Sequence, residues 1–333
     1  MILEDQIRQI SRVKSDNFRL LYLLSQYLNE RADFVSADMV REVASVGDLP
    51  EEEAFLLLFA EACGIHPTDG GEDSDFFRNC LAPSVRCLDV STYKSDPYYQ
   101  HIHFPNVKKD GWEMRTDVLK PFQLFVRDDI RPDENLRELP PLGYFKEDFP
   151  YPVVLENDRE WMLVTPNEVE TIRPAIDTAH GKVVTFGLGL GYFPYMASVK
   201  PGVEQITVVE RDPKVIALFE EFILPQFPCR EKIRLVCMDA FDYLKEIMPL
   251  QHFNYAYADI WHDAGDGLPL YLRFLPFEEH FPGTKFDYWI EQTILSRLRW
   301  QDFESMPQDI RDPYRWLSNT AVRHRALQKG SLQ

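Results

Sequence analysis

The sequence has little cysteine and little positive charge. Its 333 residues include 5 cysteines, an odd number without a Cys-x-x-Cys pair. This pattern argues against a disulfide scaffold and against a zinc ribbon, and it predicts buried free thiols. Lys and Arg total 36 against 54 Asp and Glu, so the formal net charge is -18. The averaged field of such a chain repels phosphate groups and anionic surfaces, and we therefore expect no nucleic acid and no membrane as a partner.

Long apolar segments are also missing. The longest uninterrupted apolar run, Ala54 to Ala60, is far shorter than the roughly 20 residues that cross a bilayer. Residues 1–5 lack the basic stretch that opens a signal peptide, so we expect a cytoplasmic protein. The chain does have 45% hydrophobic and 27% charged residues, a composition typical of a soluble globular protein with one large domain or two ordinary ones.

Residues 1–100 predict a helical N-terminal region. Apolar residues recur at spacings of three, four and five between Ile2 and Leu28, as they do on the buried face of an amphipathic helix. Ser36 suits the N-cap of a second helix, and Pro50 followed by three glutamates suits the first turn of a third. The first helix can face either its own domain or a second copy of the chain, so a homodimer is one expectation.

Two further segments lie before and after the central part of the chain, at residues 101–150 and 301–333. Residues 101–150 predict a proline-rich connection, because proline removes a backbone donor and blocks helix continuation. Residues 301–333 predict a helical C-terminal tail. From Arg315 onward this tail carries basic residues and no acid, which favours a helix packed on an acidic body over an arm that binds nucleic acid.

Residues 151–300 predict an α/β domain. A hairpin is expected over Pro152 to Val164, with its turn at Asn157-Asp158. A helix near Asn167 to Thr178 follows. Four short apolar strands then alternate with three helices, and the strands are expected at Lys182–Gly187, Glu204–Glu210, Ile233–Asp239 and Phe253–Asp259. This alternation predicts a doubly wound, mostly parallel, Rossmann-like sheet.

The first two strands end in residues that suit a nucleoside ligand. The first ends in Gly187-Leu-Gly189-Leu-Gly191, where glycines let the backbone turn sharply and allow a ligand to approach closely. Glu210 ends the second strand, 19 residues beyond Gly191. At this distance a carboxylate can accept both hydroxyl groups of a ribose.

The third and fourth strands end in aspartates. Asp239 is followed directly by a predicted helix, so its carboxylate can accept from an adenine amine while the Ala240 amide and the Phe241 ring flank the base. Asp259 ends the fourth strand at the carboxyl edge of the sheet, where open α/β folds bind ligands.

Taken together, the four strand ends resemble the class I S-adenosylmethionine-dependent methyltransferase fold, and within it most closely the spermidine-synthase-like branch. The resemblance covers about residues 152–265 and rests on the hairpin and on the motifs at 184–191, 208–216 and 238–244. The Gly-x-Gly-x-Gly spacing differs from the Gly-x-Gly-x-x-Gly of dinucleotide folds. The resemblance implies S-adenosylmethionine as the cofactor and no metal ion. The implied cofactor-binding residues are Gly187, Gly189, Gly191, Glu210, Arg211, Asp239, Ala240 and Phe241.

Two positions depart from the aminopropyltransferases of that branch. Leu190 stands where those enzymes carry an aspartate that helps to hold the amine substrate. They also carry an Asp-x-x-Asp pair after the fourth strand, where this chain has Asp259-Ile-Trp-His262-Asp263. His262 can take a proton from an attacking amine or hydroxyl, and Asp263 can orient its ring or bind a cation. Asp259, His262 and Asp263 are therefore the candidate catalytic residues, and Tyr192, Trp261 and Tyr271 are candidate aromatic walls.

The sequence thus predicts an S-adenosylmethionine-dependent methyltransferase whose acidic surface suits a small neutral or cationic acceptor. Two alternatives remain open. One is aminopropyl transfer in the manner of spermidine synthase, which would consume decarboxylated S-adenosylmethionine. The other is a nucleoside-binding module without turnover.

Overall fold

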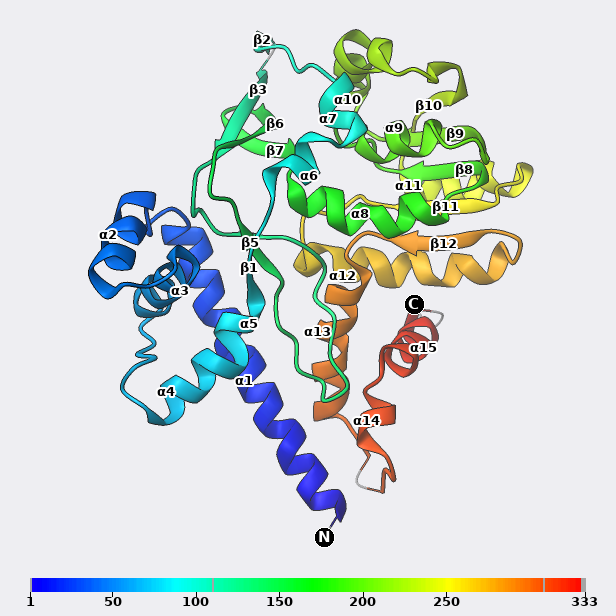
Figure 1. Ribbon diagram of the computed structural model, residues 1–333. Coiled ribbons are helices and arrows are strands. Elements are labelled where there is room, and N and C mark those ends of the chain that lie inside the picture. The colour runs from blue at the N-terminus through cyan, green and yellow to red at the C-terminus, as the bar shows by residue number, and fades with distance from the viewer. Residues whose placement is uncertain (1, 110, 308, 331–333) are drawn as a thin grey trace. The chain divides into compact units, whose positions relative to one another are not determined.

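The computed structural model describes residues 2–109, 111–307 and 309–330 (Figure 1). The chain forms two compact units, and each gathers three stretches of sequence. The first unit contains Met1–Val90, Val118–Pro150 and Leu295–Val322, and the second contains Ser91–Asp117, Tyr151–Ile294 and Arg323–Gln333. The segments expected from the sequence run consecutively instead. Their boundary at residue 150 coincides with one junction, but the predicted connection 101–150 is divided between the units because packing joins segments that are distant along the chain.

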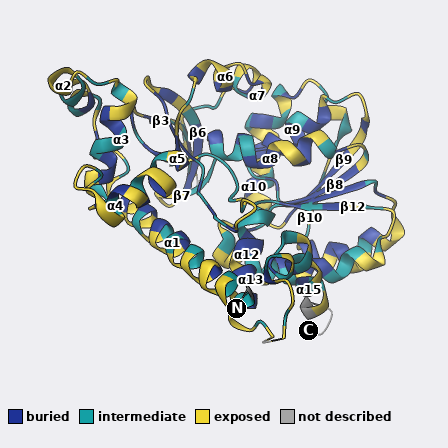
Figure 2. Ribbon diagram, turned by 60° about the horizontal axis from the view of Figure 1, so that its bottom comes forward, coloured by how far each residue is buried: buried dark blue, intermediate teal, exposed yellow. Residues whose placement is uncertain are grey.

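The first unit begins with three helices, α1 (Ile2–Arg31), α2 (Ala37–Gly47) and α3 (Glu51–Ala62). Ser36 caps α2 by accepting the N–H of Met39, as its sequence position predicts. Leu20, Leu24 and Tyr27 of α1 enter the core of the unit, whereas Phe18 and Tyr22 are exposed. Figure 2 shows exposed residues along one side of α1.

The first unit also contains the short helices α4 (Gly71–Phe76) and α5 (Ala82–Ser84) and a three-stranded sheet in the order β1 (Val85–Cys87), β5 (Leu142–Tyr144), β4 (Phe125–Val126). Its C-terminal helices are α13 (Glu291–Glu304), which belongs to this unit from Leu295 onward, and α14 (Pro313–Trp316). The buried carboxylate of Glu138 is hydrogen-bonded to three side chains of α13. It accepts from Arg299, from the Ser296 hydroxyl at 2.6 Å and from the Trp300 indole at 2.7 Å.

The second unit is built on a five-stranded parallel sheet. Its strands lie in the order β10 (Ile233–Cys237), β9 (Val203–Glu210), β8 (Gly181–Phe186), β11 (Tyr255–Ala258), β12 (Lys285–Tyr288). The register pairs Phe186 with Val209 and with Ala258, so the strands end together at one edge. The predicted α/β class with a parallel sheet is confirmed, and β12 adds a strand to the four expected.

Helices pack on both faces of this sheet. Phe193 of α9 (Tyr192–Ser198) stacks on Tyr257 of β11 at a ring separation of 4.6 Å. Phe274 of α12 (Ala264–Phe274) contacts Phe186 of β8 at 5.3 Å. Because Phe186 pairs with Ala258, the neighbour of Tyr257, these two contacts lie on opposite faces. The other helices of the unit are α8 (Pro166–Thr178), α10 (Pro213–Leu218), α11 (Ala240–Asp242) and α15 (Asn319–Gly330).

A second sheet accompanies the first in this unit, in the order β2 (Val107–Lys109), β3 (Trp112–Leu119), β6 (Phe149–Glu156), β7 (Arg159–Leu163). β6 and β7 pair antiparallel across Asn157 and Asp158. Both turn residues have positive φ, at 51° and 63°, as a two-residue hairpin turn requires. Two short helices, α6 (Val90–Lys94) and α7 (Pro97–His101), precede this sheet.

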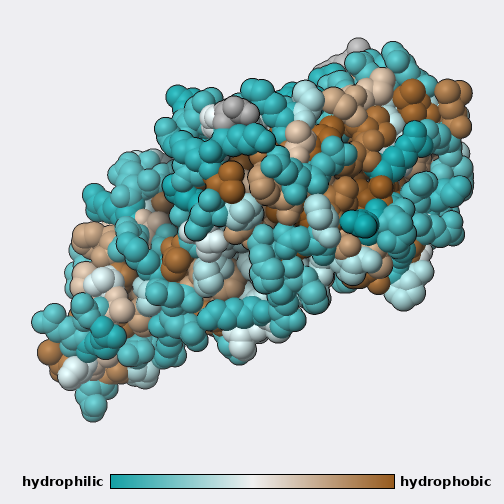
Figure 3. Space-filling model, turned by 90° about the horizontal axis from the view of Figure 1, so that it is seen from above, coloured by the Kyte–Doolittle hydropathy of each residue, from teal (hydrophilic) through white to brown (hydrophobic). Residues whose placement is uncertain are grey.

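Three sequence expectations concern the surface and the termini. All five cysteines are free, but only Cys80 is buried, and Cys87 and Cys237 are exposed, so the expectation of buried thiols is wrong for these two. None of the helices in the described part of the chain combines the length and apolarity needed to cross a membrane. Residues 331–333 of the predicted tail lie outside the described residues. Hydrophilic residues cover most of the face in Figure 3, and hydrophobic residues gather in one hollowed area of it.

Candidate functional site

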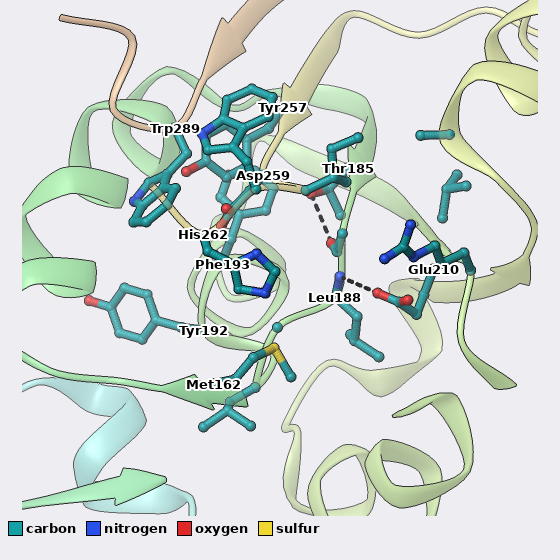
Figure 4. Close-up of a pocket in the computed structure, with 18 of the residues that line it drawn as sticks. Met162, Thr185, Leu188, Tyr192, Phe193, Glu210, Tyr257, Asp259, His262 and Trp289 are labelled. Carbon is teal, nitrogen blue, oxygen red and sulfur yellow. Dashed lines mark hydrogen bonds between the residues drawn. The ribbon is translucent and has the colours of Figure 1, made fainter. Parts of the chain in front are cut away.

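A cavity of about 550 Å³ lies in the second unit at the carboxyl ends of its parallel strands (Figure 4). It is lined from the loop after β8, from the ends of β9 and β11, from the turn after β10, and from β7, α8 and α12. Open α/β sheets bind ligands at this edge, where the strand order reverses around the first strand. Here the order reverses at β8.

The glycine loop, Gly187–Gly191, joins β8 to α9 and adopts a backbone that side chains rarely tolerate. Gly187, Gly189 and Gly191 have φ values of 96°, 55° and 80°. A Cβ at Gly187 would collide with the backbone carbonyl of Asp259, and one at Gly191 would collide with the Phe219 ring. Gly189 has no such neighbour, because the nearest atom to a Cβ there would be the Met162 sulfur at 3.8 Å. The first and third glycines are therefore needed for close packing, and Gly189 leaves room for a ligand.

Glu210 ends β9 with its carboxylate directed at this loop (Figure 4). One oxygen accepts the N–H of Leu188 at 3.2 Å and the other accepts the N–H of Asp212 at 2.9 Å. A carboxylate has about four acceptor positions, so each oxygen keeps capacity for a ligand hydroxyl. Arg211 also lines the cavity, and its side chain is exposed.

Asp239, Ala240 and Phe241 line the cavity beyond the end of β10. Asp239 caps α11 through Oδ1, which accepts from the N–H groups of Phe241 at 2.8 Å and of Asp242 at 3.3 Å. Its Oδ2 can accept from an adenine amine. The guanidinium of Arg273 lies 3.8 Å from the centre of the Phe241 ring and covers one face of it. The Phe241 ring can therefore offer a base only its other face or its edge.

Asp259 and Glu168 are a pair of acidic, partly buried residues that line the cavity. Burial raises the pKa of Asp259 to about 8, and the nearby negative charge of Glu168 adds to this shift. Burial also raises the pKa of Glu168, opposed by hydrogen bonds from Thr165. Glu168 Oε2 accepts the Thr165 hydroxyl at 2.6 Å and its N–H at 2.9 Å. The sequence signal for Glu168 is the Thr-x-x-Glu capping box of α8, which accounts for the residue structurally and hides its place in the cavity.

His262 lines the cavity, whereas Asp263 does not. The Asp263 carboxylate caps α12 and accepts the N–H of Asp266 at 3.2 Å. His262 Nδ1 lies 3.1 Å from Oδ2 of Asp266. The structure therefore places Asp266, which the sequence analysis did not select, in the position to orient the His262 ring. Figure 4 shows this ring between Asp259 and Met162.

Aromatic side chains form much of the remaining wall. Of the three predicted aromatic residues, Tyr192 and Trp261 line the cavity, and Tyr271 instead donates its hydroxyl to Glu291 at 2.6 Å. Within the described residues, the buried indole N–H of Trp261 has no hydrogen-bond partner. The sequence analysis missed the lining residues Glu160, Trp161, Met162, Phe193, Tyr257 and Trp289, because pattern alone does not show which side chains face a cavity. No group of three or more His, Cys, Asp or Glu among the described residues is arranged to hold a metal ion.

Comparison with known proteins yields fold-level similarities only. No protein-family model and no curated protein matches the chain. A candidate S-adenosylmethionine-dependent methyltransferase from Streptococcus mutans aligns with a TM-score of 0.33 and 16% identity over 48% of this chain and 45% of that one. A candidate O-methyltransferase from Klebsiella pneumoniae gives a TM-score of 0.26 and 15% identity over 47% of this chain and 62% of that one. The S-adenosylmethionine-dependent methyltransferase SibL, in its apo form, gives a TM-score of 0.25 and 17% identity over 82% of this chain and 73% of that one. The aligned part thus spans less than two thirds of the first two proteins, and at these scores the similarities carry no argument about activity.

Proposed function

We propose that this protein binds S-adenosylmethionine and transfers its methyl group to a small neutral or cationic acceptor. One observation carries the proposal: a single cavity brings together the glycine loop, Glu210 and Asp239 from the ends of three neighbouring strands. The strand order and the helices on both faces support a doubly wound sheet of the class I methyltransferase type.

The residues present fit the chemical groups of this cofactor. Gly189 leaves space beside the loop, the free acceptor positions of Glu210 suit the two ribose hydroxyls, and Asp239 Oδ2 with the Ala240 amide suits the edge of an adenine. When bound, the cofactor supplies a methyl group activated by a sulfonium. The residues of the chain then need to orient the acceptor, exclude water and receive a proton.

His262 is the proposed proton acceptor. Its Nδ1 faces Asp266, so when Nδ1 carries the proton, Nε2 presents a lone pair. A carboxylate that accepts from Nδ1 favours this tautomer and stabilises the charged ring after proton uptake. Asp266 would therefore be the positioning residue for His262, in place of Asp263.

The acidic pair favours a cation near the reacting centre. A positive group beside Asp259 and Glu168 would lower their raised pKa values by favouring the ionised forms. The cation could belong to the acceptor or to an aminopropyl group. The pair therefore keeps spermidine-synthase-like aminopropyl transfer as the second candidate, and binding without turnover as the third.

Calorimetric titration tests these candidates. Wild-type protein is titrated with S-adenosylmethionine, S-adenosylhomocysteine, decarboxylated S-adenosylmethionine and NAD, and the titrations are repeated on Glu210→Ala and Asp239→Ala. Glu204→Ala is the matched control, since Glu204 lies exposed near the start of the same strand β9. We expect binding of the first two ligands, its loss in both site variants and its retention in the control. A preference for the decarboxylated form would support aminopropyl transfer, and binding of NAD alone, or of nothing, would contradict the proposal.

A further inference from the structure

A short segment to which the sequence analysis gave no role lies against the glycine loop. Helix α7 belongs to the second unit and packs beside α9 (Figure 1). It begins after Asp96, whose Oδ1 accepts the N–H of Tyr98 at 2.8 Å and caps the helix. Two tyrosines of this helix, Tyr98 and Tyr99, each donate their hydroxyl to a backbone carbonyl of a segment distant in sequence.

Tyr98 binds the loop itself. Its hydroxyl donates to the backbone carbonyl of Leu190 at 2.6 Å, across a sequence separation of 92 residues. Leu190 stands between Gly189 and Gly191, so this bond holds the peptide between two residues of positive φ. Tyr98 is 1% exposed, and its ring packs edge-on against Tyr192 at 5.3 Å. Because a buried carbonyl that loses its donor stays unsatisfied, the bond is costly to break.

Asp96 holds the residue on the other side of Gly191. Its Oδ2 accepts the hydroxyl of Tyr192 at 2.8 Å. Burial raises the pKa of the Asp96 carboxyl, and the hydrogen bonds from Tyr192 and Tyr98 act against this shift by favouring the ionised form. Tyr192 also lines the cavity. One five-residue helix and its cap therefore contact Leu190 of the loop and Tyr192, the first residue of α9, on either side of Gly191.

Three glycines within five residues give a free loop many accessible conformations. A loop that is already held in its binding conformation loses less entropy when a ligand binds. We propose that Tyr98 and Asp96 are positioning residues of the cofactor site, which hold Leu190 and Tyr192 in the conformation that receives the cofactor. The inference rests on the proposed function for the identity of the ligand, but the contact between α7 and the loop does not depend on it.

Tyr99 provides a matched control. Its hydroxyl donates to the carbonyl of Val164 at 2.7 Å, at the end of the hairpin, and Val164 lines the cavity without belonging to the glycine loop. Tyr98→Phe and Tyr99→Phe therefore each remove one hydroxyl that binds a backbone carbonyl, and only the first of these carbonyls belongs to the loop. Asp96→Asn is a second variant that keeps an oxygen to cap α7 and weakens the contact with Tyr192.

Two measurements on the full chain test the proposal. The first is hydrogen exchange of the backbone amides of residues 188–192 in the absence of ligand, and the second is the Kd for S-adenosylhomocysteine by calorimetry. We expect faster exchange and about tenfold weaker binding in Tyr98→Phe. Asp96→Asn should change both in the same direction, and Tyr99→Phe should resemble wild type in both. Thermal unfolding of the two tyrosine variants separates positioning from general destabilisation. We expect a similar loss of Tm in both variants, so a loss of affinity in Tyr98→Phe alone cannot result from lower stability.

Unchanged exchange in Tyr98→Phe, or faster exchange with unchanged affinity, would overturn the proposal. An equal loss of affinity in Tyr99→Phe would also overturn it, since the effect would then not be specific to the contact with the glycine loop. If wild-type protein does not bind S-adenosylhomocysteine, the cofactor function falls. The exchange comparison then decides by itself whether α7 holds the loop.

Discussion

The carboxylate of Glu210 accepts the backbone N–H of Leu188 at 3.2 Å. This bond connects the end of β9 to the loop that follows β8, and the same carboxylate lines the cavity. One side chain therefore both shapes the loop and offers acceptors to a ligand. A ligand that binds Glu210 consequently meets a loop whose conformation Glu210 has helped to set.

Substitution of Glu210 should affect binding and stability together. Glu210→Ala removes the acceptor of two backbone N–H groups, so we expect a loss of about 1–3 kcal/mol in the free energy of unfolding. It also removes the acceptor proposed for the ribose hydroxyls, and we expect S-adenosylhomocysteine affinity to fall by about tenfold to a hundredfold. Urea unfolding and calorimetry measure the two effects. Retained affinity in a destabilised variant would remove Glu210 from the cofactor site.

The raised pKa of Asp259 predicts a pH-dependent stability. The unfolded chain releases the Asp259 proton near its ordinary pKa of about 4. The folded protein keeps this proton until its pKa of about 8 is reached, because burial and then the charge of Glu168 disfavour the ionised form. Since the folded state binds more protons in this window, the contribution of Asp259 to stability falls as pH rises from about 4 to about 8 and is constant above it.

Asp259→Asn removes this dependence. Relative to wild type, we expect the variant to gain about 3–4 kcal/mol in unfolding free energy between pH 5 and pH 8. Urea unfolding at the two pH values measures the difference, with exposed Asp242→Asn as the control. A difference between Asp259→Asn and wild type that does not change with pH would show that Asp259 is ionised throughout.

Asp266 and Asp263 should have separable roles around His262. Asp266→Asn should shift the His262 ring away from the tautomer that carries its proton on Nδ1, because it removes the charged acceptor at 3.1 Å. Asp263→Asn should leave the tautomer unchanged and change the stability little, because asparagine caps a helix about as well as aspartate. The ¹⁵N chemical shifts of the His262 ring report the tautomer without any substrate. If only Asp263→Asn shifts them, the assignment is reversed.

Once an acceptor is found, His262→Ala should lower kcat by about 10² to 10⁴ with little change in cofactor affinity, as expected for loss of a proton acceptor. Asp266→Asn should lower kcat less than His262→Ala does. Full activity of His262→Ala would eliminate His262 from the proposed proton transfer.

The buried pair of Glu138 and Arg299 should dominate the stability of the first unit. Both side chains are fully buried, and Glu138 also accepts from Ser296 and Trp300. Glu138→Gln leaves the Arg299 charge without its partner, so we expect a loss of about 3–5 kcal/mol in unfolding free energy. Glu304→Gln breaks the exposed pair with Lys14 and should cost less than about 1 kcal/mol. Similar losses in the two variants, measured by urea unfolding, would contradict this ranking.

Local patterns in the sequence predicted the parallel-sheet domain and part of its site. Alternating apolar strands and capped helices placed β8 to β11 and their connections, because strand and helix formation depend on residues a few positions apart. The glycine loop, Glu210 and Asp239 could be selected because each directly follows a predicted strand, and the ends of parallel strands meet at one edge. Those residues line one cavity in the structure, except Gly191, which packs against Phe219 instead.

What the sequence alone determined is therefore which residues end the strands and begin the helices. Only the tertiary structure decided which side chains meet there. Glu168 lines the same cavity as Asp259, and Tyr98 binds Leu190 from 92 residues away. Even four residues apart, the choice of Asp266 over Asp263 depended on which carboxylate the start of α12 used for its cap. Such contacts arise from the packing of whole elements against one another, and no spacing within a single element specifies them.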